Sequence, residues 1–148
     1  SWANRLLFNT RIETALGDSP GLWEDPIRRG RCIVPTMGFF EPHATETRPN
    51  PRGGKPVKRQ YRFCSPDSGG ITLLGGVRDD RTFSIVTTAP NATIAPVHDR
   101  MPLVLREDEV ESWLAGDPMA FADRSTIALD VTPEDEGNDP EGQMQLAL

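Results

Sequence analysis

The feature that most constrains the fold is a series of short apolar runs, rich in β-branched and aromatic residues, that proline and glycine repeatedly interrupt. Residues 82–88, Thr-Phe-Ser-Ile-Val-Thr-Thr, are the clearest predicted strand because turn residues bound a β-branched run. Residues 107–115 have the best helical pattern, with acids in the first turn and a glycine after the last, and Asp117-Pro118 begins a second, short predicted helix. This balance predicts an α+β fold that is rich in β-structure. The other predicted strands are residues 6–9, 31–35, 38–42, 61–63, 71–74, 103–105 and 127–131.

Charge is divided unevenly along the chain, which has 16 bases, 22 acids and a net charge of −6. That net charge does not indicate nucleic-acid binding over the whole surface. Residues 28–62, however, hold 9 of the bases and only 2 acids, whereas residues 107–148 hold 12 of the acids and a single base. Such a split can leave a basic face on an acidic protein, although a solvated basic loop and an acidic tail would give the same counts.

Stretches rich in proline and glycine divide the chain into one domain and two polar segments. Residues 43–60 contain three prolines, two glycines and five bases without periodicity, which predicts a flexible basic loop. Residues 132–148 are acidic and also contain proline and glycine, which predicts a loosely ordered tail. A single domain is therefore expected over residues 1–131.

The two cysteines, Cys32 and Cys64, give no disulfide framework and fit a reducing compartment. Together with His43 and His98 they lack the spacing of a zinc site, so we expect neither a metal nor a cofactor. Cys32 lies in an apolar strand pattern and is expected to be an inert, buried thiol. No apolar run approaches the roughly 20 residues that a membrane-spanning helix needs. We expect a cytoplasmic monomer without a membrane partner.

Polar residues stand directly after three strand-like runs, and these residues are the candidates for chemistry. Asn9 follows Leu-Leu-Phe, Glu41 follows Gly-Phe-Phe and His98 follows Ala-Pro-Val. A carboxylate next to two phenylalanines loses water, which raises its pKa and suits it to general acid–base work. A histidine followed by Asp99 and Arg100 can carry protons near neutral pH. Two ordinary alternatives stay open: an outward-facing strand glutamate, and a histidine that pairs with Asp99 in a loop.

Three segments resemble, in order, motifs of the SRAP family, the SOS-response-associated peptidases or abasic-site processing proteins. Residues 9–14, Asn-Thr-Arg-Ile-Glu-Thr, resemble the family's Asn-Ala-Arg-x-Glu-Thr motif, and Ser-Trp-Ala at residues 1–3 resembles the segment before it. Residues 31–41, with Arg-Cys-Ile-Val-Pro and Gly-Phe-Phe-Glu, resemble the second motif. Residues 87–102, from Thr-Thr-Ala-Pro-Asn to His-Asp-Arg-Met-Pro, resemble the third. The resemblance implies mixed and antiparallel strands that form a barrel-like sheet flanked by short helices.

Members of this family respond to DNA damage by joining themselves covalently to abasic sites in single-stranded DNA. The resemblance implies an N-terminal cysteine, exposed by autoproteolytic removal of Met, as the nucleophile. Its α-amine forms an imine with the ring-opened sugar aldehyde, and its thiol closes a thiazolidine. The implied partner is therefore single-stranded DNA that contains abasic sites, on which the protein would be nucleoid-associated.

The resemblance also implies roles for six residues of this chain. Asn9 would position the sugar or the N-terminus, while the side chains of Glu41 and His98 would transfer protons. Arg11 and Arg100 would hold flanking phosphates, and Trp2 would stack on a base. The implied catalytic residues are Asn9, Glu41 and His98, and the implied DNA-binding residues are Arg11, Arg100 and Trp2.

The sequence also departs from the family pattern. Ser1 aligns inside the domain, so the family's Cys-Gly-Arg start is absent from residues 1–148, and we expect that this chain alone cannot form the thiazolidine. Pro42 stands where the family has Trp. Two alternatives therefore stay open beside the crosslinking enzyme: a non-catalytic single-stranded-DNA-binding module of the same fold, and a peptidase, as the family name suggests. Whether the chain acts as an enzyme, and as a hydrolase or a lyase, depends on that choice.

Overall fold

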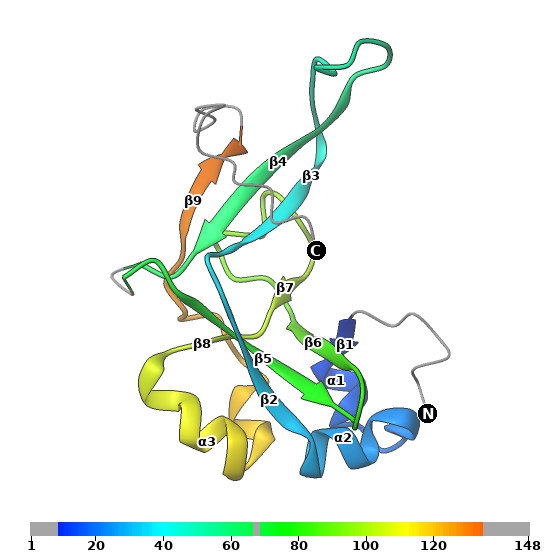
Figure 1. Cartoon of the computed structure of the whole chain (residues 1–148), viewed down its shortest axis with the longest axis vertical. Coiled ribbons are helices and arrows are strands. Elements are labelled where there is room, and N and C mark those ends of the chain that lie inside the picture. Colours follow the sequence, from blue (N-terminus) through cyan, green and yellow to red (C-terminus); the bar gives the residue numbers. More distant parts are fainter. Residues whose placement is uncertain (1–8, 67–68, 135–148) are drawn as a thin grey trace.

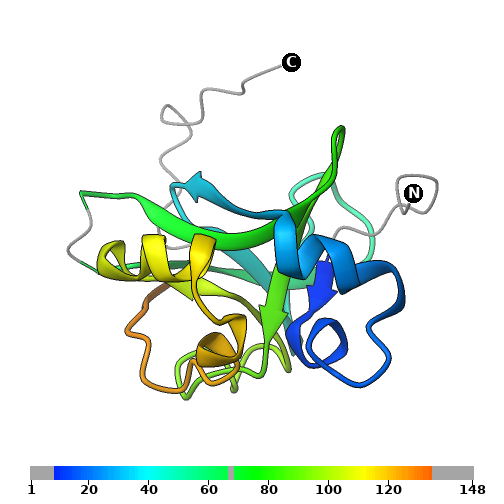
Figure 2. The ribbon, with the colours of Figure 1, turned by 90° about the horizontal axis from the view of Figure 1, so that it is seen from below.

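The computed structural model describes residues 9–66 and 69–134 (Figure 1). Short helices gather at one end of the molecule, and a long β-hairpin projects from the other end (Figures 1 and 2). The helical segments are α1 (Ile12–Ala15), η2 (Gly21–Trp23), α2 (Glu24–Arg29), η3 (Glu107–Glu109), α3 (Val110–Ala115) and η4 (Pro118–Phe121). The strands are β1 (Asn9–Arg11), β2 (Arg31–Thr36), β3 (Phe39–Arg48), β4 (Val57–Cys64), β5 (Thr72–Arg78), β6 (Phe83–Thr88), β7 (Met101–Pro102), β8 (Val104–Leu105) and β9 (Asp130–Pro133).

Six strands form one sheet in the order β1-β6-β5-β2, in which β7 also pairs with β6 and β8 with β5. β1 runs parallel to β6, whereas β2, β6 and β8 are antiparallel to β5. Inside the sheet the hydroxyl of Thr10 donates a hydrogen bond of 2.8 Å to the hydroxyl of Ser84, and both side chains are buried. This contact satisfies two polar groups that would otherwise be costly to bury.

The other three strands form a second, antiparallel sheet in the order β3-β4-β9. β3 and β4 make up the projecting hairpin, and their pairing shifts register between Pro42 and Thr47. The two sheets together curl into a half-barrel with the short helices at its end (Figure 2). The predicted α+β fold, rich in β-structure and built from mixed strands around a curved sheet, is therefore confirmed.

Two apolar clusters hold the fold together, one on each face of the six-stranded sheet, because successive strand residues point to opposite faces. Trp113 of α3 centres the first cluster and is fully buried. Its indole N–H donates to the carbonyl oxygen of Cys32 at 2.9 Å, and its ring meets Phe121 edge-on. The second cluster contains Phe63, Leu74, Ile94, Val97, Met101, Val104, Ile127 and Leu129. This second cluster supports the polar site described below.

Three sequence predictions need correction. The expected loop at 43–60 is mostly strand, because β3 continues to Arg48 and β4 begins at Val57, so only residues 49–56 connect them. The last strand covers Asp130–Pro133 instead of 127–131; Ile127 and Leu129 are buried outside any strand. The expected tail at 132–148 thus begins within β9, and its residues 135–148 lie outside the described residues. Cross-strand partners far along the chain decide these boundaries, and local composition does not reveal them.

Candidate acid–base site

Glu41 lies on β3, opposite Tyr61 of β4, and its side chain is largely buried, with 21% exposed. Strand alternation places it on the same face as Phe39, which stacks on Phe63 at 5.5 Å. Burial raises the pKa of the Glu41 carboxyl; a charge on His98 acts in the opposite direction, and the charge on Asp99 adds to the increase. Glu41 therefore holds a proton at higher pH than an ordinary glutamate.

His98 faces this carboxyl. Its Nε2 lies 3.8 Å from Oε2 of Glu41, which is within ion-pair range when the imidazole is protonated. The Nδ1 of His98 lies 3.1 Å from both the backbone nitrogen and the carbonyl oxygen of Arg100, so it accepts a hydrogen bond from the first or donates one to the second according to the tautomer of the ring. Asp99 Oδ1 lies 3.5 Å from Nδ1, but this carboxylate is 89% exposed and adds little in water. The predicted Glu41 and His98 are thus brought together.

Asn91 holds the loop that carries His98, and the sequence interpretation assigned it no role. Its side-chain N–H donates to the carbonyl of Ile127 at 2.8 Å, and its Oδ1 accepts from the backbone N–H groups of Thr93 and Ile94, both at 3.1 Å. The N–H of His98 in turn donates to the carbonyl of Ile94 at 2.9 Å. An asparagine directly after a proline is a turn signal that could have revealed this role.

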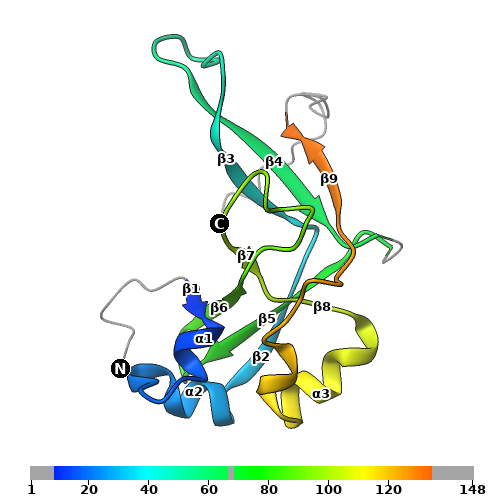
Figure 3. The same ribbon diagram turned by 180° about the vertical axis from the view of Figure 1, so that it is seen from behind.

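The same loop is attached to the strand that carries Glu41. The backbone N–H of Ala44 on β3 donates to the carbonyl of Val97 at 3.1 Å. Figure 3 shows the loop between β6 and β7 beside the base of the hairpin. Because this bond lies next to His98 and three residues from Glu41, it fixes the separation of the two side chains.

Arg100 is engaged by neighbours within the protein. Its two terminal nitrogens donate to the two carboxylate oxygens of Glu13, both at 2.9 Å, and one of them also donates to the carbonyl of Thr87 at 2.9 Å. These side-chain hydrogen bonds hold the pKa of the Glu13 carboxyl below its usual value. The Nε of Arg100 is buried without an acceptor among the described residues. Arg100 therefore joins α1 to the loop of His98, and a phosphate contact at this residue stays a prediction.

The other three predicted site residues are not part of this contact group. Asn9 and Arg11 are exposed on β1, and no hydrogen bond or ion pair within the described part of the chain joins either one to Glu41 or His98. Arg11 precedes Ile12, the first residue of α1, so it lies two positions before Glu13, the partner of Arg100. Trp2 lies outside the described residues.

A sequence model of the family described as SOS response associated peptidase (SRAP) matches residues 1–136. The chain belongs to the SRAP family. This match confirms the resemblance carried by the three motifs, and it covers every described element from β1 to β9.

SRAP relatives with curated names are abasic site processing proteins. YoqW of Bacillus subtilis is 27% identical over 117 residues, which cover 73% of this chain and 47% of YoqW. YMR114C of Saccharomyces cerevisiae is 33% identical over 112 residues, 72% of this chain and 27% of that protein. A crystal structure of a protein from Bacteroides thetaiotaomicron matches with a TM-score of 0.61 at 27% identity, over 84% of this chain and 57% of that one. The chain thus spans about half the length of YoqW.

Other kinds of site find little support in the described residues of this SRAP chain. Within residues 9–66 and 69–134, no group of three or more His, Cys, Asp and Glu side chains is arranged to hold a metal ion. None of the helices in these ranges is long and apolar enough to cross a membrane. Burial raises the pKa of the Cys32 thiol, against a smaller opposing effect of Arg78, so this thiol is a poor nucleophile. The Glu41–His98 pair is the arrangement best suited to proton transfer.

Proposed function

We propose that this protein processes abasic sites in single-stranded DNA and that Glu41 and His98 transfer the protons. The observation that carries the proposal is the pair itself: a half-buried carboxyl with a raised pKa, 3.8 Å from an imidazole nitrogen. A carboxyl that stays protonated to higher pH is a better general acid near neutral pH. The names of the SRAP relatives supply the substrate class.

The chemistry needs one acid and one base. An amine adds to the C1′ aldehyde of the ring-opened sugar, forming a C–N bond and a carbinolamine. The carbinolamine hydroxyl then takes a proton from the acid and leaves as water, and nitrogen loses its proton as the imine forms. Glu41 supplies the proton to the departing hydroxyl, and His98 accepts one from nitrogen. A thiol that adds across the imine closes the thiazolidine without further loss of atoms.

The resemblance implies a terminal cysteine as the source of both amine and thiol. Neither Cys32 nor Cys64 has a free α-amine, because the nitrogen of each is joined in a peptide bond to the residue before it. The proposal therefore assigns the proton-transfer groups to residues 1–148, and it leaves the nucleophile to a cysteine at the mature N-terminus.

The test uses the protein expressed from its own gene, mixed with a single-stranded oligonucleotide that carries one abasic site. We expect an adduct that survives a denaturing gel, and none with an intact oligonucleotide. Glu41→Gln and His98→Ala should each slow adduct formation by about 100- to 10,000-fold. Glu111→Gln, an exposed change on α3, is the matched control and should leave the rate unchanged.

Each other outcome has a definite meaning. Absence of an adduct with the abasic oligonucleotide would refute crosslinking, and salt-sensitive binding without an adduct would identify a non-catalytic binding module. Adduct formation at the wild-type rate in both site variants would refute the proton-transfer roles. Loss of Met from the N-terminus, measured by mass spectrometry in the Glu41→Gln His98→Ala double variant, would show that the pair is not needed for autoproteolysis.

A further inference from the structure

The projecting hairpin concentrates positive charge on an otherwise acidic protein. We call residues 47–60, the outer part of β3 and β4 with their connection, the hairpin arm. The arm carries 5 of the chain's 16 bases and none of its 22 acids. Six of the arm's residues, 47–48 and 57–60, belong to β3 and β4, and residues 49–56 form the connection that these two strands carry outward. A basic projection of this kind is a suitable surface for a polyanion.

The five bases of the arm differ in their partners. Arg48 lies 3.4 Å from the carboxylate of Glu134, and Arg59 lies 3.5 Å from that of Glu46. These two pairs join the arm to the residue that follows β9 and to the preceding part of β3. The remaining bases are exposed and make no ion pair with any residue in the described ranges; they are Arg52, Lys55 and Lys58.

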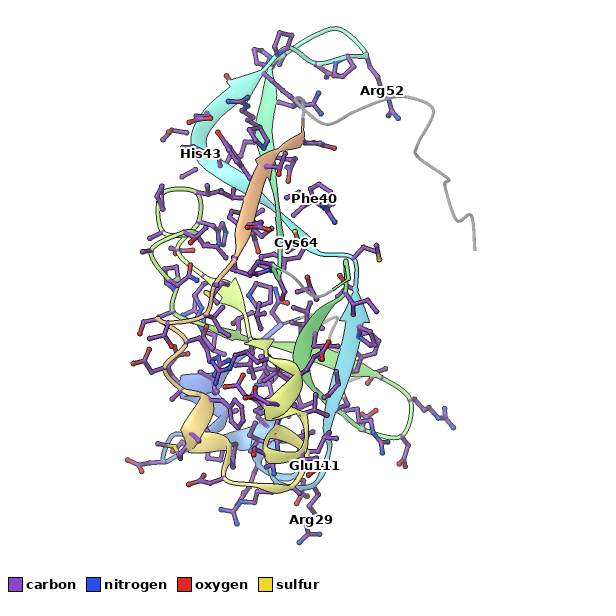
Figure 4. The ribbon with its side chains drawn as sticks, turned by 90° about the vertical axis from the view of Figure 1, so that its left-hand side faces the viewer. Arg29, Phe40, His43, Arg52, Cys64 and Glu111 are labelled. Atoms are coloured by element: carbon purple, nitrogen blue, oxygen red, sulfur yellow. The ribbon has the colours of Figure 1, made fainter. Side chains whose placement is uncertain are left out.

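The end of the arm has a defined shape. Asn50 closes a turn there: its side-chain oxygen accepts from the N–H of Arg52 at 3.0 Å, and its carbonyl accepts from the N–H of Gly53 at 2.9 Å. Gly53 and Gly54 follow with φ of 75° and 91°, a conformation that favours glycine. Figure 4 shows Arg52 projecting at this end, whereas Arg29 lies at the opposite end of the molecule. The turn therefore presents its cations to solvent in a fixed direction.

The arm begins six residues beyond Glu41 on β3, and its unpaired cations lie farther still from the candidate site. Glu41 and Arg48 are seven residues apart on β3, which corresponds to roughly 20 Å of strand, shortened somewhat by the irregular pairing. The Debye length at physiological salt is about 8 Å, so charges at the end of the arm scarcely alter the potential at Glu41. They can act on a bound strand only by touching it.

We propose that the hairpin arm binds the phosphates of single-stranded DNA that flanks the lesion, through Arg52, Lys55 and Lys58. The inference rests on the proposed function, since the strand must first be bound at the site at the base of the arm. It assigns to the arm the affinity for flanking nucleotides and leaves the choice of lesion to the site. Lysine and arginine bind phosphates regardless of base sequence.

The experiment measures how salt affects binding. The ligand is a single-stranded oligonucleotide with a central tetrahydrofuran, an abasic analogue that has no aldehyde, and about 16 nucleotides on each side to exceed typical site sizes. Each phosphate contact contributes about 0.7 to the slope of log K against log salt for single strands. Replacing the three bases with Gln should therefore make the slope about 2 less steep. Between about 50 and 200 mM salt, the wild type should lose about 20-fold more affinity than this variant.

A charge-matched control separates the arm from net charge. The triple variant Arg28→Gln Arg29→Gln Arg81→Gln also removes three exposed bases, but none of them lies on the arm. It should retain the wild-type slope, and the arm variant should retain the wild-type preference for the analogue over intact DNA.

Equal slopes for the wild type and the arm variant would refute the arm's role while leaving the proposed function intact. An equal decrease in the control would refute it as well, since net charge would then explain the effect. Absence of binding by the wild type would refute the proposed function, and the arm's role would fail with it.

Discussion

Replacing Asn91 with Ala would remove the side chain that holds the loop of His98. Asn91 is 4% exposed and makes three hydrogen bonds, to the carbonyl of Ile127 and to the N–H groups of Thr93 and Ile94. Alanine makes none of them. The Ile127 carbonyl and the Ile94 N–H belong to buried residues, whereas Thr93 is only half-buried, so water can replace its bond.

The magnitude follows from those two buried groups. An unsatisfied buried donor or acceptor costs about 1–3 kcal/mol, so two of them predict a loss of about 2–6 kcal/mol in the free energy of unfolding. Relaxation of the loop toward water reduces this figure, and we expect about 3 kcal/mol. For a chain of this size that corresponds to a decrease of about 10 °C in Tm.

Urea denaturation measures the free energy, and the adduct assay measures the effect on the site. Asn91 is a positioning residue for His98, so the alanine variant should also form the adduct more slowly under conditions where it stays folded. Asn50→Ala is the control, because it removes the same side chain from a turn at the end of the arm and should cost less than about 1 kcal/mol. A loss below 1 kcal/mol for Asn91→Ala would show that these hydrogen bonds do not hold the loop.

Three further changes test other parts of the structure. Folding raises the pKa of the Glu41 carboxyl, so the ionisation of this group lowers the stability of the protein as pH rises above about 4.3, the ordinary pKa of glutamate. Glu41→Gln should therefore raise Tm at pH 7 and leave it unchanged at pH 3. Equal Tm values for the wild type and the variant at pH 7 would contradict the loss of water at Glu41. Arg124 is 6% exposed and lies 2.6 Å from the carboxylate of Glu109, so Glu109→Gln leaves it without its counter-charge. The variant should lose about 3–5 kcal/mol in the free energy of unfolding, measured by urea denaturation. A loss below 1 kcal/mol would refute the buried ion pair. Gly75→Ala places a Cβ 2.5 Å from Leu103 Cδ2 and should cost about 1–3 kcal/mol; an unchanged Tm would show that Leu103 moves freely.

Local sequence patterns were sufficient where an element depends on its own residues. The β-branched run at 82–88 is β6, and the acid-led pattern at 107–115 is the η3–α3 segment that ends before Gly116. In that segment Glu109 accepts from the backbone N–H of Arg106 at 2.9 Å, which satisfies a donor at the helix start. Hydrogen bonds of this kind join residues three apart, so their residue types appear close together in the sequence.

The hairpin arm could not be predicted in that way. Its prolines, glycines and bases match the composition of a loop, and no alternation marks the strands. The strands form because β3 and β4 pair across the connection, with Thr47 opposite Lys58 and Arg48 opposite Val57. Glu134, 86 positions from Arg48, then pairs with it. The contact between Arg48 and Glu134 involves residues that no short window of sequence contains.

The candidate site shows the same division between local and distant causes. Two phenylalanines before Glu41 predicted its loss of water, and its pKa is raised, but Phe40 is 52% exposed and points to the other face of the strand. Phe39 shares the face of Glu41, and the loop of His98 lies against the same strand through Ala44. The prediction was therefore right about the carboxyl and wrong about one of its two neighbours.

Contacts among the three SRAP motifs explain how the chain can carry a long arm without a change in the separation of Glu41 and His98. Glu13 of the first motif pairs with Arg100 of the third, and Glu41 of the second faces His98 of the third. The loop that ends at Arg100 thus contacts both other motifs. The arm continues β3 beyond Ala44, whose backbone N–H bonds to that loop. It projects away from the helices (Figure 1). Changes in the length of the arm should therefore alter the surface available to a bound strand while the Glu41–His98 separation stays the same.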